Sequence, residues 1–213
     1  MKAFLLALVA ASAALCARAV PLERDLGLGL AYLRVHALPE DLSGPELVGS
    51  ACVLDLRYVR GGSDQAPVLM AWLRRHAGPH TPVFLLANEA TSAALLAPLN
   101  APNSVTGLVI LGAAVRDFDP DIAVRVSAAT ERRAYDALEG GAPADSLVVE
   151  KTDKPRNDEA TLAKARQQDS GADDEPAADE ASRQPKPAAP QLIDPVLQRA
   201  VQLHRSLLAL KRI

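Results

Sequence analysis

The chain has 213 residues, of which 23 are lysine or arginine and 26 are aspartate or glutamate, for a formal net charge of −3. A chain of this length accommodates one ordinary domain plus extensions. The negative balance disfavours nucleic-acid binding, which needs a basic footprint, and an aromatic content of 3% leaves too few rings for a stacking platform.

Residues 1–19 have the pattern of a secretory signal peptide. Lys2 is followed by an apolar run from Ala3 to Leu15 and then by Ala17-Arg18-Ala19, which gives a positive start, a short apolar core and a cleavage site of small residues. The apolar run is too short to form a stable membrane span. The sequence therefore predicts export to the periplasm or the outside of the cell, cleavage after residue 19 and no transmembrane span afterwards. Retention of the segment as an anchor is the alternative.

Cleavage would change the inventory of charges and thiols. Losing Lys2 and Arg18 lowers the 23 basic residues to 21 against 26 acidic ones, so the mature net charge would be about −5. Cys16 would also be lost, and Cys52 alone cannot form an internal disulfide. Because Cys52 lies in the apolar run "ACVLDL", we expect a buried, unreactive thiol.

Residues 20–141 alternate short apolar runs with amphipathic ones, which is typical of an α/β core. Strands are expected over residues 26–38, 51–59, 82–88, 106–114 and 121–126. The second of them is continuously apolar, as in a strand buried on both faces, so the sheet is expected to be largely parallel.

Three helices are expected between these strands or after them. The first is capped by Ser63 or Asp64 and ends at Gly78-Pro79. The second is short and covers residues 91–99. The third covers residues 127–141 and is closed by a pair of glycines at its end.

Residues 142–190 differ in composition and are rich in Ala, Pro, Asp and Glu. From residue 153 onward the segment has no aromatic residue and almost no branched aliphatic one, so it cannot bury enough apolar area to offset the entropy of ordering. A disordered, charged linker is predicted.

Residues 191–213 predict a C-terminal amphipathic helix. Asp194 is the expected cap, and Pro195 suits the first helical position. The apolar face of this helix is compatible with docking on the core, on a partner or on a membrane surface, and these alternatives stay open.

Four short motifs stand out along the chain. They are Asp55-Leu56-Arg57 with Gly61-Gly62, Asn88 with Glu89-Ala90-Thr91, Pro120-Asp121-Ile122 with Val124, and Asp194-Pro195 with Leu197-Gln198-Arg199-Ala200. In this order they resemble motifs of the carboxyl-terminal processing proteases, also called tail-specific proteases, which are exported serine peptidases. The resemblance covers about residues 26–140 and the last helix. It implies a crotonase/ClpP-like core.

The resemblance fails at the catalytic residues. The family's nucleophile is a serine five residues beyond the asparagine, which corresponds to Ala93, whereas Ser92 comes one residue early. The family's general base is a lysine after the next strand, but the mature chain has no lysine before Lys151. A serine hydroxyl needs such a base, and the guanidinium of Arg116 stays protonated. His36, at a strand exit, is left as the candidate base.

The candidate site residues therefore have two interpretations each. Ser92 is the candidate catalytic serine, but the pattern favours Ser92, or Thr91 beside it, as the cap of a helix that begins at residue 93. By resemblance, Gly61 and Gly62 are candidates for donating backbone N–H groups to an oxyanion. The alternative for these glycines is a turn that needs a positive φ.

The sequence thus favours an exported tail-specific-protease-like domain that is catalytically inactive and binds or scaffolds a polypeptide or protein partner. An active serine hydrolase that uses Ser92 with a base other than lysine is the alternative. The sequence shows no metal-ligand spacing, P-loop or dinucleotide fingerprint, so neither a metal nor a cofactor is expected.

Overall fold

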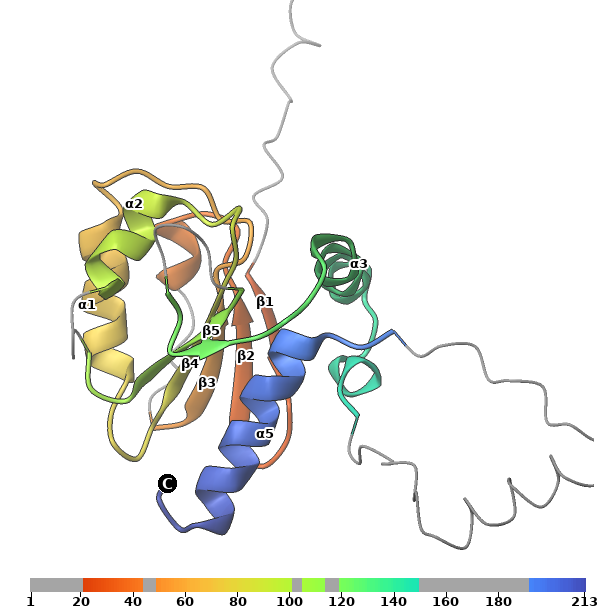
Figure 1. The fold of residues 1–213 in the computed structure, drawn as a ribbon. Coiled ribbons are helices and arrows are strands. Elements are labelled where there is room, and N and C mark those ends of the chain that lie inside the picture. Colours follow the sequence, from red (N-terminus) through yellow and green to blue (C-terminus); the bar gives the residue numbers. More distant parts are fainter. Residues whose placement is uncertain (1–20, 44–48, 101–104, 114–118, 150–191) are drawn as a thin grey trace, which may run out of the picture.

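The computed structural model describes residues 21–43, 49–100, 105–113, 119–149 and 192–213. The predicted signal peptide lies outside the described residues, and so do residues 150–190 of the predicted linker. The described residues form three layers, with helices on both faces of a single sheet (Figure 1).

Six strands form the sheet, and their order across it is their order along the chain. They are β1 Leu22–Asp25, β2 Leu30–Arg34, β3 Ala51–Asp55, β4 Val83–Ala87, β5 Leu108–Gly112 and β6 Ile122–Ala123. β1 and β2 are antiparallel, and every later neighbouring pair is parallel. The prediction of an α/β fold with largely parallel strands is therefore confirmed. β3 and β4 are buried at every position, as expected for central strands covered on both faces.

The first part of the sheet differs from the prediction. The sequence predicts one strand over residues 26–38, whereas β1 and β2 are two strands joined by a tight turn. Gly27, Leu28 and Gly29 have φ values of 79°, 56° and 74°, and this left-handed run reverses the chain. The apolar pattern misleads because leucines alternate with glycines through the turn as they would along a strand.

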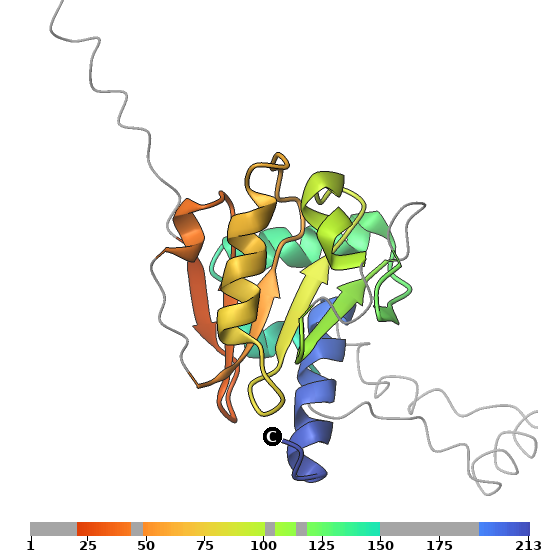
Figure 2. The same ribbon diagram turned by 90° about the vertical axis from the view of Figure 1, so that its left-hand side faces the viewer.

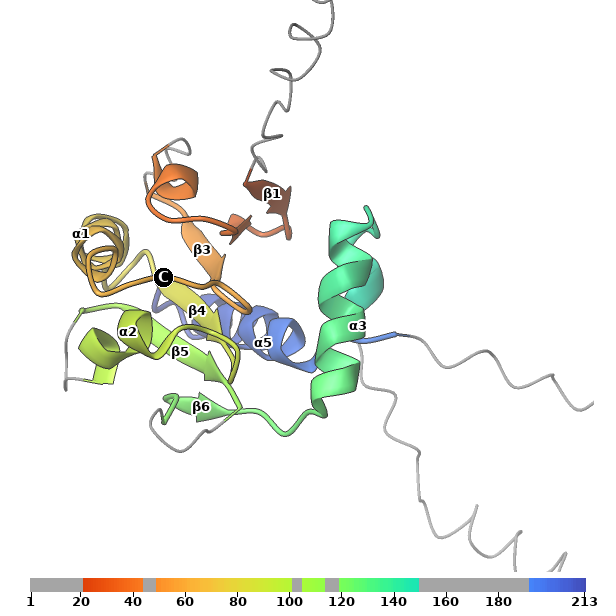
Figure 3. The same ribbon diagram turned by 90° about the horizontal axis from the view of Figure 1, so that it is seen from above.

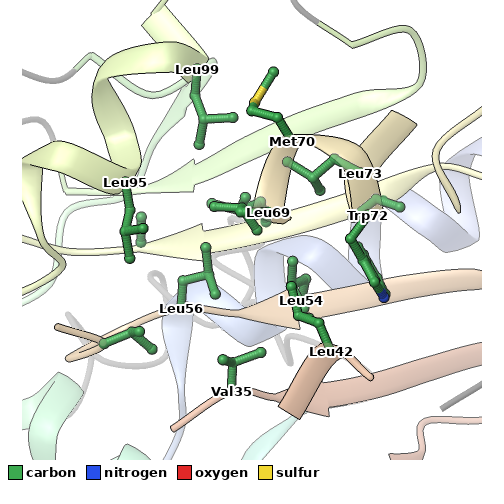
Figure 4. Close-up of a cluster of buried hydrophobic side chains, with 14 of the residues drawn as sticks. Val35, Leu42, Leu54, Leu56, Leu69, Met70, Trp72, Leu73, Leu95 and Leu99 are labelled. Carbon is green, nitrogen blue, oxygen red and sulfur yellow. The ribbon is translucent and has the colours of Figure 1, made fainter. Parts of the chain in front are cut away.

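Helices α1 (Ala66–His76) and α2 (Ala93–Leu96) cover one face of the sheet (Figure 2). The apolar pattern predicts both of them. Their buried leucines meet those of β3 and of the residues that follow it in one apolar cluster (Figure 4). The fully buried leucines of this cluster include Leu54, Leu56, Leu69, Leu73 and Leu95.

The start of α1 differs from the prediction. The N-cap residue is Gln65, not Ser63 or Asp64, and its side chain makes no capping hydrogen bond. Instead, Nε2 of Gln65 donates to the carbonyl of Leu38 at 2.8 Å, and Oε1 accepts from the amide of Gly62 at 3.2 Å. The side chain therefore joins the loop before α1 to the segment that follows β2.

Helix α5 (Pro195–Ala209) covers the other face of the sheet, where it contacts β3, β4 and β5 (Figure 1). Asp194 is its N-cap, as predicted, and accepts hydrogen bonds from the amides of Val196 and Leu197 at 3.1 and 3.0 Å. These two side chains are buried in a second apolar cluster with Ala200 and Val201. Of the three docking alternatives for the terminal helix, the structure shows packing on its own core.

Helix α3 (Ala128–Glu139) follows β6 and begins and ends close to where the sequence predicts. The hydroxyl of its N-cap residue Ser127 accepts a hydrogen bond from the amide of Thr130 at 3.1 Å, and Gly140 is its C-cap.

Residues 142–149 are folded, although the sequence assigns them to the linker. They contain the 3-10 helix η3 (Ala144–Leu147), and Leu147 and Val148 are buried in the apolar cluster of α5. The amide of Asp194 donates to the carbonyl of Leu147 at 3.0 Å. The predicted core boundary at residue 141 is therefore wrong, because these few apolar side chains dock beside the terminal helix.

Two further 3-10 helices complete the described elements. η1 (Glu40–Leu42) follows β2, and η2 (Ala97–Asn100) continues α2. Within the described residues, no helix combines the length and the hydrophobicity needed to cross a membrane.

Candidate functional site

The carboxyl ends of the parallel strands β2 to β5 lie at one edge of the sheet, which we call the carboxyl edge. Ligands of open α/β sheets bind at this edge. Residues 35–38, 56–62 and 88–92 leave it, so all the predicted site residues gather there. Helix α3 lies beside this edge on the α5 side of the sheet (Figure 3).

Ser92 is the N-cap residue of α2, but its hydroxyl does not cap the helix. Oγ of Ser92 donates to the carbonyl of Gly61 at 2.6 Å, and the amide of Ser92 donates to the carbonyl of Val59 at 3.0 Å. The helix does begin at residue 93, as predicted. Ser92 therefore occupies the predicted cap position, but its side chain does not cap the helix. It fastens the start of α2 to the loop after β3.

Thr91 has a similar fastening role one residue earlier. Its hydroxyl donates to the carbonyl of Leu56 at 3.0 Å and accepts from the amide of Asn88 at 3.0 Å. The hydroxyl groups of Thr91 and Ser92 thus join the turn after β4 to the loop after β3.

The described part of the chain brings no lysine or histidine to Ser92. Its one lysine, Lys211, follows α5, which ends at the opposite end of the molecule (Figure 2). The ring of His36 lies at the carboxyl edge but faces other groups. Its Nε2 is 3.2 Å from Oε2 of Glu139, and its Nδ1 is 3.8 Å from Oδ2 of Asp41.

Gly61 and Gly62 neither adopt a positive φ nor present two free donors. The positive φ of this loop belongs to Tyr58, at 66°, so the turn interpretation of the glycines is wrong. The amide of Gly62 donates to Gln65, as described above. A Cβ on Gly61 would lie 2.5 Å from Oε1 of Gln65 and 3.0 Å from Cδ1 of Leu95, so a larger residue there would have to displace the ends of these two side chains.

A buried ion cluster joins the first and last of the four motifs. Arg57 lies between Asp55 and Asp194, and all three side chains have no exposed surface. Nη2 of Arg57 is 2.7 Å from Oδ2 of Asp55 and 2.9 Å from Oδ2 of Asp194. Nη1 donates to Oδ1 of Asp194 at 3.1 Å, so one guanidinium holds the end of β3 to the start of α5.

The cluster continues along the carboxyl edge through Tyr32 and Arg34. The hydroxyl of Tyr32 donates to Oδ2 of Asp55 at 2.7 Å and accepts from Nε of Arg34 at 3.0 Å. Nη1 of Arg34 donates to Oε2 of Glu139, at the end of α3, at 2.7 Å. Arg57, just after β3, thus holds the start of α5, and Arg34, at the end of β2, holds the end of α3.

Helix α3 closes the cluster from the side. Glu131 accepts from Nδ2 of Asn88 at 3.2 Å, and its other oxygen lies 3.9 Å from Nη1 of Arg57. The ring of Tyr135 lies 3.8 Å from the guanidinium carbon of Arg34 and 4.7 Å from the ring of Tyr58. These contacts hold α3 against the carboxyl edge.

The pKa shifts follow the packing of these charges. Burial by itself would raise the pKa of Asp55, but the charge and hydrogen bonds of Arg57 outweigh it, and the pKa lies below its usual value. Burial raises the pKa of Glu131, and the positive charge of Arg57 offsets only part of this rise. Burial also raises the pKa of the Cys52 thiol to about 12, in agreement with the expectation of a buried, unreactive thiol.

The sequence points to Asp55, Arg57 and Asp194 as motif residues but does not connect them. An arginine in a strand-end motif and an aspartate at a distant helix cap are each common on a surface. The sequence does not indicate that these three side chains are buried together. Among the described residues, no group of three or more histidines, cysteines or carboxylates comes together as a metal site, and the cluster acts as a fastening between segments.

No protein-family model matches the chain, and no curated protein matches it either. The resemblance to tail-specific proteases therefore stays a hypothesis that rests on the four motifs.

Proposed function

We propose that this chain is an exported tail-specific-protease-like domain with a crotonase/ClpP-like core, which has lost peptidase chemistry and binds or scaffolds a polypeptide partner. The four motifs support the family assignment, and residues 1–19 support export. The sequential, largely parallel sheet is compatible with the proposed core.

One observation carries the loss of chemistry. The hydroxyl of Ser92 donates to the carbonyl of Gly61 at 2.6 Å, and no lysine or histidine of the described residues accepts its proton. A catalytic serine must pass this proton to a base as it attacks. Removing that base typically lowers the rate by orders of magnitude.

The oxyanion side of the site supports the same proposal. The amide of Gly62 already donates to Gln65, whereas an oxyanion hole needs donors aimed at the reacting oxygen. The half-buried Tyr58 and the exposed Arg60 and Glu89 leave side chains at the surface of this edge. They are the groups that a bound polypeptide would meet.

A fluorophosphonate probe tests the loss of chemistry. We expect no adduct on the mature protein and none on a Ser92→Ala variant, while an active serine peptidase in the same reaction is labelled. An adduct at Ser92 that the variant lacks would contradict the proposal and favour the alternative of an active serine hydrolase with a base other than lysine.

Peptide panning tests the binding role. A library of unstructured peptides is selected on the mature protein, and the enriched peptides are checked by mass spectrometry. We expect them to stay uncut, to bind Arg60→Ala more weakly and to bind the control Arg133→Ala, on the exposed face of α3, unchanged. Failure to enrich any peptide, or cleavage of the enriched ones, would contradict this role.

A further inference from the structure

Two exposed leucines lie at the end of the molecule opposite the carboxyl edge. Leu28 is 65% exposed in the turn between β1 and β2, and Leu210 is 69% exposed just after α5. The turn and the end of α5 lie at the same end in two perpendicular views (Figure 1, Figure 2). In the described residues, the next most exposed large apolar side chain is Val68, at 39%, on the first turn of α1.

The backbone around Leu28 is fixed in a conformation that leucine rarely adopts. Leu28 has a φ of 56° between two glycines that are also left-handed. The amide of Gly27 donates to Oδ1 of Asp25 at 2.8 Å, and the amide of Leu26 donates to the carbonyl of Leu30 at 2.9 Å. A left-handed leucine is disfavoured in L-peptides, so an exposed one on a hydrogen-bonded turn indicates a role for the side chain.

Basic side chains are exposed where α1 and α5 end. Arg74 and Arg75 are exposed in the last turn of α1, and Lys211 and Arg212 are exposed after α5. The two groups are adjacent, because Nδ1 of His80, in the loop after α1, lies 3.3 Å from the carbonyl of Arg212. Together with Arg24, these cations outnumber the exposed carboxylates of Glu23, Asp25 and Asp145 near the β1–β2 turn, so this end is basic on balance although the whole chain has a net charge of −3.

We propose that this end of the protein docks on the surface of an anionic phospholipid bilayer. The two leucines enter the boundary between headgroups and acyl chains, and the four basic side chains lie against lipid phosphates. Apolar tips flanked by lysine and arginine are the combination that holds proteins at such a surface. The inference is independent of the peptide-binding role, which concerns the carboxyl edge.

A neighbouring hollow makes a peptide a weaker choice of occupant. A cavity of about 800 Å³ lies between the β1–β2 turn, η3 and α5. Its rim carries two arginines and two aspartates, namely Arg24, Arg205, Asp25 and Asp145. The charges of the rim therefore balance, whereas the exposed side chains near Leu210, at the ends of α1 and α5, are basic.

Vesicle co-sedimentation tests the proposal with the mature protein from residue 20, which keeps every described residue. We expect binding to vesicles of phosphatidylcholine and phosphatidylglycerol, weaker binding at 0.5 M than at 0.05 M NaCl, and little binding to pure phosphatidylcholine. The double variant Leu28→Ser/Leu210→Ser should bind roughly tenfold more weakly, and Val68→Ser is its matched control.

The basic side chains are tested in the same assay. Arg75→Glu/Lys211→Glu should also lose roughly tenfold or more in affinity, while Arg60→Glu/Arg133→Glu, with the same charge change away from this end, keeps most of it. All these side chains are exposed, so each variant should melt where the parent does. Absence of binding to the anionic vesicles, or equal losses in the control variants, would overturn the proposal.

Discussion

The two faces of the sheet are held in different ways. On one face, α1 and α2 pack through an apolar cluster built from segments that follow one another along the chain. On the other face, α5 also packs through apolar side chains, but its first turn is fastened by the buried ion cluster of Asp55, Arg57 and Asp194. Arg57 and Asp194 are 137 residues apart in the sequence.

The difference shows what each kind of contact can specify. Short connections already restrict where α1 and α2 can lie, so nonspecific apolar burial is enough for them. A helix that follows a long connection, such as α5, could bury its apolar face on the sheet in several different positions. We infer that the guanidinium of Arg57, with two carboxylates in fixed geometry, selects one of them.

Deleting α5 should have the largest effect. A chain that ends at Pro190 loses three large buried apolar side chains, each of which contributes about 1.5–3 kcal/mol, from a total stability of roughly 5–15 kcal/mol. We expect the truncated mature protein to lose its cooperative thermal transition. Adding a peptide of residues 191–213 should restore the transition, and the same peptide with Asp194→Ala should restore it far less. Equal rescue by both peptides would contradict the selecting role of the ion cluster.

Removing the charge of Arg57 should have the next largest effect. Arg57→Met leaves Asp55 and Asp194 buried without their cation, which typically costs about 3–5 kcal/mol. The control Arg132→Met breaks an exposed pair with Asp136 at 2.9 Å and should destabilise the fold far less, because water screens a pair of exposed charges. Chemical denaturation of both variants measures the difference.

The loss in Arg57→Met should depend on pH. The folded pKa of Asp55 lies below its usual value, so its pairing stabilises the fold above the unfolded pKa of about 3.9. That contribution disappears as the pH falls through the folded value. The gap in unfolding free energy between parent and variant should therefore be full at pH 7 and narrow in acid. A gap that stays constant down to pH 3 would contradict the charge explanation.

An apolar deletion on the opposite face should lower stability without that pH dependence. Leu69 is fully buried between α1 and the sheet, and Leu69→Ala should cost about 2–5 kcal/mol through lost burial and a cavity. Its effect on the unfolding free energy should be the same at pH 7 and pH 3. A loss that varies with pH as in Arg57→Met would mean that the two faces are coupled.

The sequence predicts most of the apolar face and little of the charged one. The helical spacing of Leu69 and Leu73 locates α1, because burial on one side of a helix repeats every three to four residues. The turn at Gly27 escapes prediction because its leucines continue the apolar pattern into a reversal. Leu147 and Val148 escape because their burial depends on a helix that begins far along the chain.

The candidate site is predicted in position but not in its contacts. The strand ends place Ser92, Gly61 and Arg57 at one edge, since parallel strands share their carboxyl ends. The residue that accepts from the Ser92 hydroxyl is a backbone carbonyl, and no pattern of side chains in a sequence indicates that. Tertiary contact alone connects Arg57 to Asp194.

A carboxylate pair on α3 should give small effects of opposite sign. The folded pKa of Glu131 is raised by burial, so its contribution to stability is present below the unfolded pKa of about 4.3 and is lost as the pH rises. Glu131→Gln keeps an acceptor for Asn88 and should raise the melting temperature at pH 7, with a gain of about 1 kcal/mol or less. The gain should vanish near pH 4.

Glu139 is the matched control for that substitution. Burial would raise its pKa, but its hydrogen bonds to His36 and Arg34 lower it below the usual value. Glu139→Gln should therefore lower the melting temperature at pH 7, by an amount limited by the 51% exposure of the side chain. If the melting temperature moved in the same direction in both variants, the conclusion that the charge of Glu131 destabilises the fold at pH 7 would be wrong.

Ser92 should give the smallest effect, and its direction separates three roles. Ser92→Ala removes the donor to the Gly61 carbonyl and should cost about 1 kcal/mol, since the bond fastens α2 to the loop after β3. A catalytic serine often can be removed with no loss of stability or with a gain. Ser92→Asp distinguishes the remaining two roles, because a carboxylate can cap a helix but cannot donate to a carbonyl. We expect Ser92→Asp to melt below Ser92→Ala, since its charge faces the oxygen of Gly61. If Ser92→Asp instead melts at or above the parent, Ser92 acts as a helix cap, and the fastening role is wrong.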